Sequence, residues 1–134
     1  ISGLVEQIDI MPTLLDMLGL KSPSDISGKS LLPLIVNGQE VKGEVFAGLE
    51  FNSVLNISTF FNKKSRIEVV RTKEWKLIKE DLFDNEKNIS TVSYELFDIA
   101  NDKKELHNVA GDKKDILKGL LSKLDSWSKS VRRK

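Results

Sequence analysis

The chain has 134 residues, of which 40% are hydrophobic and 31% are charged. This size fits a small globular fold and is too short for a typical two-domain enzyme. With 21 basic and 20 acidic residues the formal net charge is only +1, so no charge excess indicates a nucleic acid or an anionic membrane surface as a partner. The sequence contains no cysteine, which excludes disulfides, thiolate metal sites and a cysteine nucleophile from this chain.

The first residue and the hydropathy of the sequence indicate whether the chain is a segment of a longer protein and whether it could span a membrane. The chain begins at Ile1 without an initiating methionine, and no apolar run approaches the roughly 20 residues that span a bilayer. We therefore expect this chain to be a segment of a longer protein, and we expect no membrane among its partners.

Two short helices are predicted in the first 42 residues. Apolar residues at helical spacing lie between Asp9 and Gly19, which predicts a helix over Ile10–Leu18 with Asp9 as its N-cap. Pro12 falls in the first turn, where the backbone N–H groups have no partner within the helix, so a proline is tolerated there. A second and shorter helix is predicted around Leu31–Ile35, before the helix stop at Gly38.

Strand-type patterns follow from Gly43 onward. Four runs rich in β-branched and aromatic residues predict strands over Glu44–Phe51, Arg66–Thr72, Trp75–Lys79 and Tyr94–Ile99. Only Lys73 and Glu74 separate the second run from the third, so these two strands should form an antiparallel hairpin, although this dipeptide is not a favoured two-residue turn. The polar stretches Asn52–Ser65 and Asp81–Ser93 are predicted as loops.

The tail carries the clearest periodicity in the sequence. Apolar residues recur at intervals of three and four from Ile116 to Val131, which predicts an amphipathic helix. The element order indicates an α+β fold, a four-stranded antiparallel sheet with a packed C-terminal amphipathic helix, preceded by one or two short helices. The residues expected in the core between sheet and helix are Val69, Leu77, Leu120, Leu124 and Trp127.

The sequence offers little catalytic chemistry of its own. His107 is the only histidine, which excludes paired-histidine zinc sites, and its polar neighbours favour a surface position. No G-x-x-x-x-G-K-[ST], G-x-G-x-x-G or G-x-S-x-G motif is present. Asp98, Asp102 and Glu105 cluster near one strand end, but their spacing is not that of an EF-hand, and we expect a solvated acidic turn. We therefore predict no catalytic residue and no metal ligand in this chain.

Several segments resemble parts of one enzyme family in the same order. Asp9–Gly19 and Gly28–Leu34 resemble the sulfatase-family helix and the glycine-lysine-serine-leucine stretch that follows it. Val70–Ile78 resembles the family's hairpin, and Tyr94–Asn108 resembles its closing strand and turn, before a terminal helix with tryptophan. Each segment alone is a common pattern, but the four in order cover nearly the whole chain. The sequence thus resembles the C-terminal portion of a sulfatase, a hydrolase of the alkaline phosphatase superfamily.

The resemblance implies a parent enzyme whose large N-terminal α/β domain carries the active site. In that family a formylglycine, made from Cys or Ser in a C/S-x-P-x-R motif, attacks the sulfate ester, and upstream residues bind a divalent cation, usually calcium. The motif requires Cys or Ser two positions before a proline. The residues two positions before Pro12, Pro23 and Pro33 are Ile10, Lys21 and Leu31, so the motif is absent here. The resemblance therefore implies no cofactor in this chain, with calcium and formylglycine in the parent. It also implies that residues 1–42 end the α/β domain and that residues 43–134 form the C-terminal subdomain.

We expect the chain to be inert alone, because it lacks both the nucleophile and the metal ligands. In the parent it should pack on the N-terminal catalytic domain and help to shape the pocket for a sulfated small molecule or glycan. The loop between the first two strands mixes aromatic and cationic residues, a combination suited to an anionic ester with an organic body. The residues expected at the pocket rim are Asn52, Phe60, Phe61, Asn62, Lys63 and Lys64.

Two alternatives remain open from the sequence. The same portion could belong to a phosphate mono- or diesterase of the superfamily, which the nucleophile of the parent would reveal. The chain could instead be a non-catalytic binding or assembly module, which an open reading frame continuing upstream into a large α/β domain would exclude.

Overall fold

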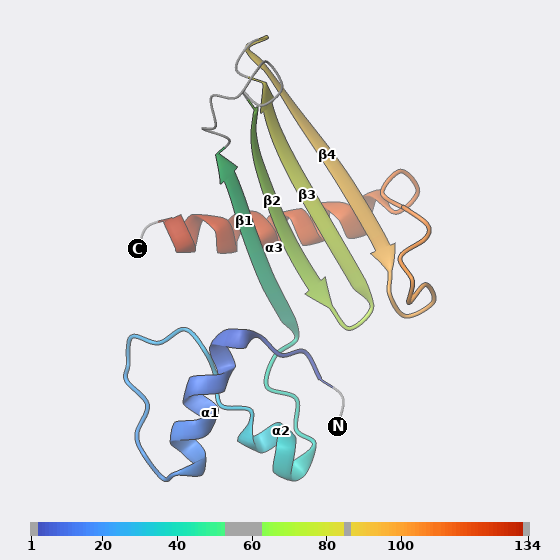
Figure 1. The fold of residues 1–134 in the computed structure, drawn as a ribbon. Coiled ribbons are helices and arrows are strands. Elements are labelled where there is room, and N and C mark those ends of the chain that lie inside the picture. Colours follow the sequence, from blue (N-terminus) through green and yellow to red (C-terminus); the bar gives the residue numbers. More distant parts are fainter. Residues whose placement is uncertain (1–2, 53–62, 85–86, 133–134) are drawn as a thin grey trace. The chain divides into compact units, whose positions relative to one another are not determined.

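The computed structural model describes residues 3–52, 63–84 and 87–132. The chain forms two compact units, Ile1–Val45 and Phe46–Lys134. The first unit is helical, and the second is an antiparallel sheet with one long helix (Figure 1). Among the described residues, no helix combines the length and the apolar character needed to cross a bilayer. The predicted α+β fold is confirmed.

The helical unit contains the two helices that the sequence predicts. A 3-10 turn, η1 (Gln7–Asp9), runs directly into α1 (Ile10–Met17), and α2 (Leu32–Asn37) follows after a turn-rich connection. Gly19 and Gly38 follow the two helices with φ angles of 69° and 68°. Residues that carry a Cβ rarely adopt this left-handed backbone conformation, so glycine at these two positions allows the helices to end there.

Asp9 stands at the N-cap position of α1, as predicted, but its side chain does not cap the helix. Asp9 has helical dihedral angles, φ −80° and ψ −15°, and its side chain makes no capping hydrogen bond to α1. An N-cap residue normally has extended dihedrals, whereas here η1 continues into α1 without a break. The carboxylate of Asp9 is therefore available for donors elsewhere in the unit.

The sheet contains four strands in sequential order. They are β1 (Glu44–Asn52), β2 (Lys63–Thr72), β3 (Trp75–Asp84) and β4 (Ile89–Asp98), and neighbours along the chain are neighbours in the sheet (Figure 1). The predicted hairpin through Lys73 and Glu74 is confirmed, with Arg71 opposite Lys76. The hydroxyl of Thr72 accepts a hydrogen bond of 3.0 Å from the Trp75 N–H and so closes the turn.

The strands are longer than the sequence predicts. The stretches expected to be loops contribute residues 63–65 to β2, 81–84 to β3 and 89–93 to β4. Pairing continues through these polar residues, as in Ser65 opposite Leu82 and Phe83 opposite Ser90. One face of an antiparallel sheet can be exposed to water, so polar residues are compatible with regular pairing.

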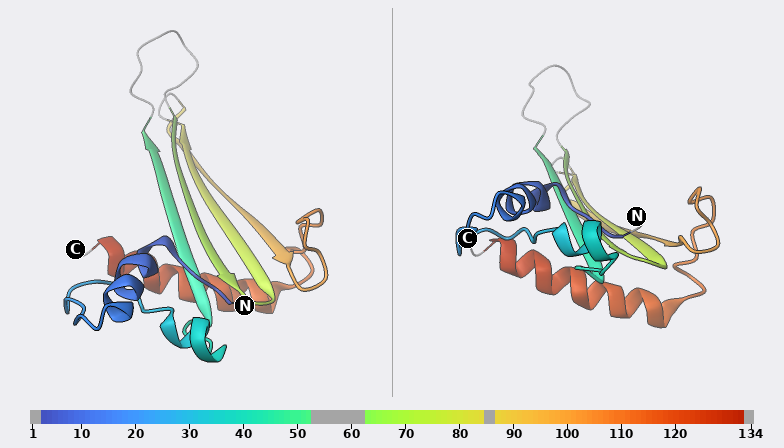
Figure 2. Two further views of the ribbon diagram at one scale, coloured as in Figure 1. Left: turned by 60° about the horizontal axis from the view of Figure 1, so that its bottom comes forward. Right: turned by 90° about the horizontal axis from the view of Figure 1, so that it is seen from below.

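The helix α3 (Lys114–Arg132) lies across one face of the sheet and contacts β2 and β3 (Figure 2). As predicted, Leu77, Leu120 and Leu124 are buried in the core. Trp127 is half-buried and stacks on Phe46 of β1, with ring centroids 5.4 Å apart. Among the described residues, the buried core cluster between sheet and helix consists of Val70, Leu77, Leu96, Leu120 and Leu124.

The predicted core position of Val69 is wrong, since the residue after it, Val70, occupies the core. Successive strand residues point to opposite faces of a sheet, so Val69 lies on the face opposite α3. There it lines a shallow hollow of about 330 Å³ together with Ile67 and Ile78. The remaining lining residues are polar or charged, namely Lys76, Glu80, Ser93 and Glu95.

Candidate functional site

Three of the six residues predicted for a pocket rim, Asn52, Lys63 and Lys64, lie at one end of the sheet. Asn52 is the last residue of β1 and Lys63 is the first residue of β2, which pairs with Asp84 at the end of β3 (Figure 1). The side chain of Lys64 is exposed next to this end. Phe60, Phe61 and Asn62 lie outside the described residues, and Asn52 and Lys63 are described only through their strand backbone. The structure therefore brings three of the six residues to one sheet end, and the rim itself stays a prediction.

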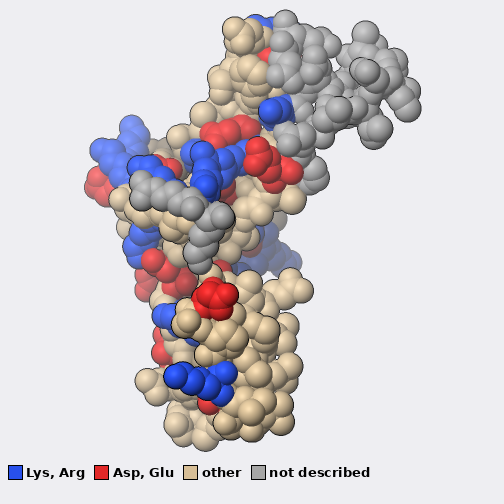
Figure 3. Space-filling view, turned by 90° about the vertical axis from the view of Figure 1, so that its left-hand side faces the viewer, with Lys and Arg blue, Asp and Glu red and all other residues tan. Residues whose placement is uncertain are grey.

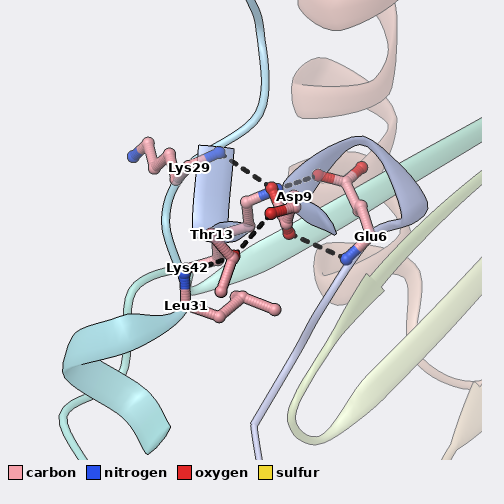
Figure 4. A network of polar contacts seen from close by, with 6 residues as sticks. All are labelled: Glu6, Asp9, Thr13, Lys29, Leu31 and Lys42. Atoms are coloured by element: carbon pink, nitrogen blue, oxygen red, sulfur yellow. Dashed lines mark hydrogen bonds and ion pairs between the residues drawn. The ribbon is translucent and has the colours of Figure 1, made fainter. Parts of the chain in front are cut away.

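A network of polar contacts around Asp9 organises the helical unit (Figure 4). The Asp9 carboxylate is fully buried and accepts hydrogen bonds of 2.9 Å from both the Glu6 N–H and the Lys29 N–H. The ammonium group of Lys42 donates to the same carboxylate at 2.6 Å and also pairs with the Glu6 carboxylate. One buried carboxylate thus connects three parts of the unit that are distant in sequence.

Thr13 extends this network from α1 to the segment that precedes α2. Its hydroxyl donates to the Asp9 carbonyl at 2.5 Å and accepts from the Leu31 N–H at 2.9 Å. Gly28 lies so close to η1 that a Cβ added there would be 2.0 Å from the Ile8 carbonyl oxygen. The glycine-lysine-serine-leucine stretch, which the sequence analysis singled out only by resemblance, is therefore held against α1 by backbone contacts.

Both charged groups of the network have shifted pKa values. Burial alone would raise the pKa of Asp9, but hydrogen bonds from Lys42 and from the N–H groups of Lys29 and Glu6 outweigh it and lower the pKa below its ordinary value. Burial alone would lower the pKa of Lys42, and its bonds to Asp9 and Glu6 raise it instead. Both groups stay charged around neutral pH, which suits structural pairing and not proton transfer.

A second buried carboxylate connects α3 to the sheet. Glu68 of β2 is 1% exposed, and its Oε1 accepts from the Ser128 hydroxyl and from Arg66, each at 2.7 Å. Its Oε2 has no hydrogen-bond partner among the described residues, with the Lys79 ammonium 3.8 Å away. Glu68 was not among the residues predicted from the sequence. Strand residues two positions apart point to the same face, so Glu68 lies on the face of Val70, which α3 covers. Its partners are cations and a hydroxyl of the same unit, which indicates a structural role.

The acidic residues after β4 pair with their own neighbours. Asp98 binds the Asn101 side chain at 2.9 Å, and Glu105 pairs with Lys76 at 2.6 Å. The Asp102 carboxylate accepts from the N–H groups of Leu106 and His107 at 2.8 and 2.9 Å, and chiefly the bond from His107 lowers its pKa. The His107 side chain is 80% exposed. In the described part of the chain, no group of three histidine, cysteine or acidic side chains is placed to hold a metal ion.

Formylglycine does not fit the sequence of this chain, and a divalent cation does not fit the residues that the structure describes. A formylglycine requires Cys or Ser two positions before a proline, and Ile10, Lys21 and Leu31 occupy those positions. The acidic residues after β4 are turned toward backbone N–H groups, an amide and a lysine, and do not converge on one point. No catalytic step is therefore assigned to this chain.

Comparisons with known proteins agree on one family. The family described as "N-sulphoglucosamine sulphohydrolase, C-terminal" matches residues 1–130. Arylsulfatase K of Bos taurus and of Homo sapiens are each 32% identical over 127 residues, which cover 94% of this chain and 22% of each relative. The chain thus spans about a fifth of the length of the curated relatives it matches.

A solved structure shows the same fold. The structure of BT4656 in complex with its substrate D-Glucosamine-2-N, 6-O-disulfate superposes with a TM-score of 0.67 at 24% sequence identity and covers 93% of this chain and 24% of that chain. The resemblance inferred from short segments is confirmed by matches that extend over nearly the whole sequence. The chain therefore belongs to the N-sulphoglucosamine sulphohydrolase C-terminal family and is a C-terminal portion of the sulfatase type.

Proposed function

We propose that this chain is the C-terminal part of a sulfuric ester hydrolase, in which it packs on the N-terminal catalytic domain and helps to shape the substrate pocket. The observation that carries this proposal is the family match over residues 1–130 in a chain that spans only 22% of its arylsulfatase relatives. Residues 1–42 would end the catalytic α/β domain, and residues 43–134 would form the C-terminal subdomain. Formylglycine and a divalent cation, for which calcium is the candidate, would be held by the catalytic domain.

The same comparisons support a proposed substrate class. The relatives are named arylsulfatases, and BT4656 was solved with a sulfated glucosamine as its substrate. A sulfated small molecule or glycan is therefore the proposed substrate of the full-length protein. Its anionic sulfate and its organic body suit a rim that combines lysine with aromatic residues.

The isolated chain is expected to show no turnover of sulfate or phosphate esters, because it contains neither the nucleophile nor a cluster of metal ligands in its described residues. The test compares the 134-residue chain with the full-length protein on aryl sulfates and aryl phosphates, with calcium, magnesium or manganese added. Sulfate ester turnover by the full-length protein alone supports the proposal. Turnover by the chain that disappears on mutation of one of its residues contradicts it, and turnover of phosphate esters only by the full-length protein would favour a phosphatase.

Removing the two lysines at the start of β2 is expected to weaken catalysis by the full-length protein. In Lys63→Ala/Lys64→Ala, loss of cationic contacts to the substrate should lower kcat/KM by roughly 5- to 150-fold. Steady-state kinetics on several sulfated substrates measure the effect, with thermal unfolding recorded for each variant.

A matched control for this variant is Lys103→Ala/Lys104→Ala. These two lysines are likewise adjacent in sequence, and both are exposed. They follow β4, whose end at Asp98 pairs with Trp75 at the opposite end of the sheet. The control removes the same charge and should leave kcat/KM unchanged. Equal kinetics for both double variants on every substrate would remove the start of β2 from the substrate pocket.

A further inference from the structure

The strand β4 lies at one edge of the sheet and pairs with a single strand, β3 (Figure 1). The direction of its backbone groups can be read at Leu96. The Leu96 N–H donates to the Asn108 side chain at 3.0 Å, and the Leu96 carbonyl accepts from the Val109 N–H at 2.9 Å. Both groups of Leu96 therefore point away from β3, and every second residue of an antiparallel strand shares this direction. The outward-pointing residues before Leu96 are Ser90, Val92 and Tyr94.

Asn108 covers this edge at one end only. Its side-chain amide donates to the Tyr94 carbonyl at 3.1 Å and accepts from the Leu96 N–H, so it takes the place of a neighbouring strand there. We call Ile89–Tyr94, the part of β4 up to this point, the edge segment. Five of its outward backbone groups have no hydrogen-bond partner among the described residues. They are the N–H and carbonyl groups of Ser90 and Val92 and the N–H group of Tyr94.

The side chains of the edge segment do not protect it from pairing. Natural edge strands usually carry charged residues, a proline or a bulge, and the edge segment has no charge, no proline and an uninterrupted register with β3. Ile89, Val92 and Tyr94 are 53%, 44% and 37% exposed. The other edge strand, β1, contains Glu44 and Glu50, and Figure 3 shows charged side chains of both signs on the side of the molecule where β1 lies. The edge segment therefore has the properties of a strand that pairs with another chain.

We propose that the edge segment pairs with the edge segment of a second copy of this protein, antiparallel and across a two-fold axis at Val92. In this register the two copies of Val92 exchange two hydrogen bonds, and the Tyr94 N–H of each copy donates to the Ser90 carbonyl of the other. The Tyr94 carbonyl, which Asn108 already occupies, is not required. The unpaired groups of one copy thus match those of the other, and the inference concerns assembly, beyond the proposed hydrolase function.

The side chains of this register also fit a second copy. Val92 lies opposite Val92 of the second copy, and pairs of β-branched residues stabilise antiparallel strands. Glu95, the first charged residue after the edge segment, lies opposite Ile89, so like charges do not face each other across the axis. Both copies use the same edge in a two-fold contact, so the pairing stops at a dimer.

Removal of the outward N–H of Val92 tests the proposal in the full-length protein. Val92→Pro removes this N–H, and an edge strand tolerates proline there because the group does not bond to β3. Sedimentation velocity is expected to show a wild-type dimer at micromolar concentration and a dissociation constant at least about ten-fold higher for Val92→Pro. The matched control Val92→Thr keeps the N–H and the β-branched shape and should dimerise like wild type. A monomeric wild type, or equal dissociation constants for the two variants, would overturn the proposal.

A thiol at the same position tests the register and remains informative if Val92→Pro fails to fold. The Cα atoms of a hydrogen-bonded antiparallel pair are about 5.5 Å apart, which is within the range of a disulfide. On oxidation, Val92→Cys is therefore expected to form a disulfide between two copies, which mass spectrometry of the linked peptides identifies. Leu49→Cys, at an exposed position of β1, should form none.

Hydrogen exchange of the Val92 amide distinguishes a second copy from other partners of the edge segment. Protection of this amide in the dimer, and its loss on dilution to the monomer, supports the proposal. Protection that persists in the monomer would mean that another part of the same protein covers the edge. That result, or a disulfide from Leu49→Cys without one from Val92→Cys, contradicts the proposed dimer.

Discussion

Replacing Asp9 with alanine is expected to lower the free energy of unfolding of the helical unit by about 3 kcal/mol. The substitution removes the acceptor of the Glu6 and Lys29 N–H groups, and it removes one of two carboxylates around the Lys42 ammonium. The Lys42 side chain is only 8% exposed, so its charge would stay largely buried with Glu6 as its remaining partner. Breaking a buried ion pair by removing one partner can cost about 3 to 5 kcal/mol, and the pairing with Glu6 places this case at the lower end.

Hydrogen exchange is the suitable measurement for this substitution. Both tryptophans of the sequence, Trp75 and Trp127, belong to the second unit, so their fluorescence does not report on the helical unit. Exchange of the Glu6 and Lys29 amides should accelerate in Asp9→Ala and stay near wild type in Asp16→Ala. Asp16 is an exposed carboxylate of the same helix with a single hydrogen bond to Ser30. Equal exchange in the two variants would show that the buried carboxylate does not hold the unit together.

The pKa shifts fix the pH range in which this network stabilises the unit. The pKa of Asp9 is lowered on folding, so its contribution is present above the unfolded value near 3.8 and is lost as the pH falls through the folded value. The pKa of Lys42 is raised, so its contribution is present below 10.5 and is lost as the pH rises through the folded value. Wild type is expected to lose amide protection as the pH falls below 3.8, and Asp9→Ala should remove this pH dependence.

The periodicity of the sequence was sufficient to predict each α-helix and strand of the described residues, but not the 3-10 turn η1 or the face on which each residue lies. Leu120 and Leu124 recur at helical spacing and, like Leu77, lie in the core as predicted, whereas Val69 and Val70 are adjacent and both apolar. Two adjacent apolar residues in a strand point to opposite faces, and the sequence alone does not say which face α3 covers.

The polar networks could not be predicted, because their partners are far apart in the sequence. Asp9 and Lys42 are 33 residues apart, and Glu68 and Ser128 are 60 apart. Local spacing made an N-cap the natural interpretation of Asp9, and only the tertiary contact with Lys42 explains its burial. The rim of the substrate pocket is still harder to predict from the sequence. Under the proposed function, this rim also depends on the part of the catalytic domain that the chain does not include. The sequence could supply suitable residue types at the ends of β1 and β2, and no more.

Leu77→Ala is expected to lower the free energy of unfolding of the second unit by about 3 to 5 kcal/mol. Leu77 is fully buried among Val70, Leu96 and the leucines of α3, so truncation removes apolar contacts and leaves a cavity between the sheet and the helix. The neighbouring substitution Ile78→Ala is the matched control. Ile78 is half-buried on the opposite face, beside the shallow hollow, and its truncation should cost only about 1 kcal/mol.

Urea unfolding followed by tryptophan fluorescence measures both variants, because Trp75 and Trp127 each pack against the core cluster. The two adjacent residues project from opposite faces of β3, so the difference between the two free energies reports which face of the strand packs against α3. Leu77→Ala should shift the midpoint to lower urea with little change in the slope, as expected for a loss of stability without a change in the surface exposed. Equal costs, or a larger cost for Ile78→Ala, would mean that α3 covers the other face of the sheet.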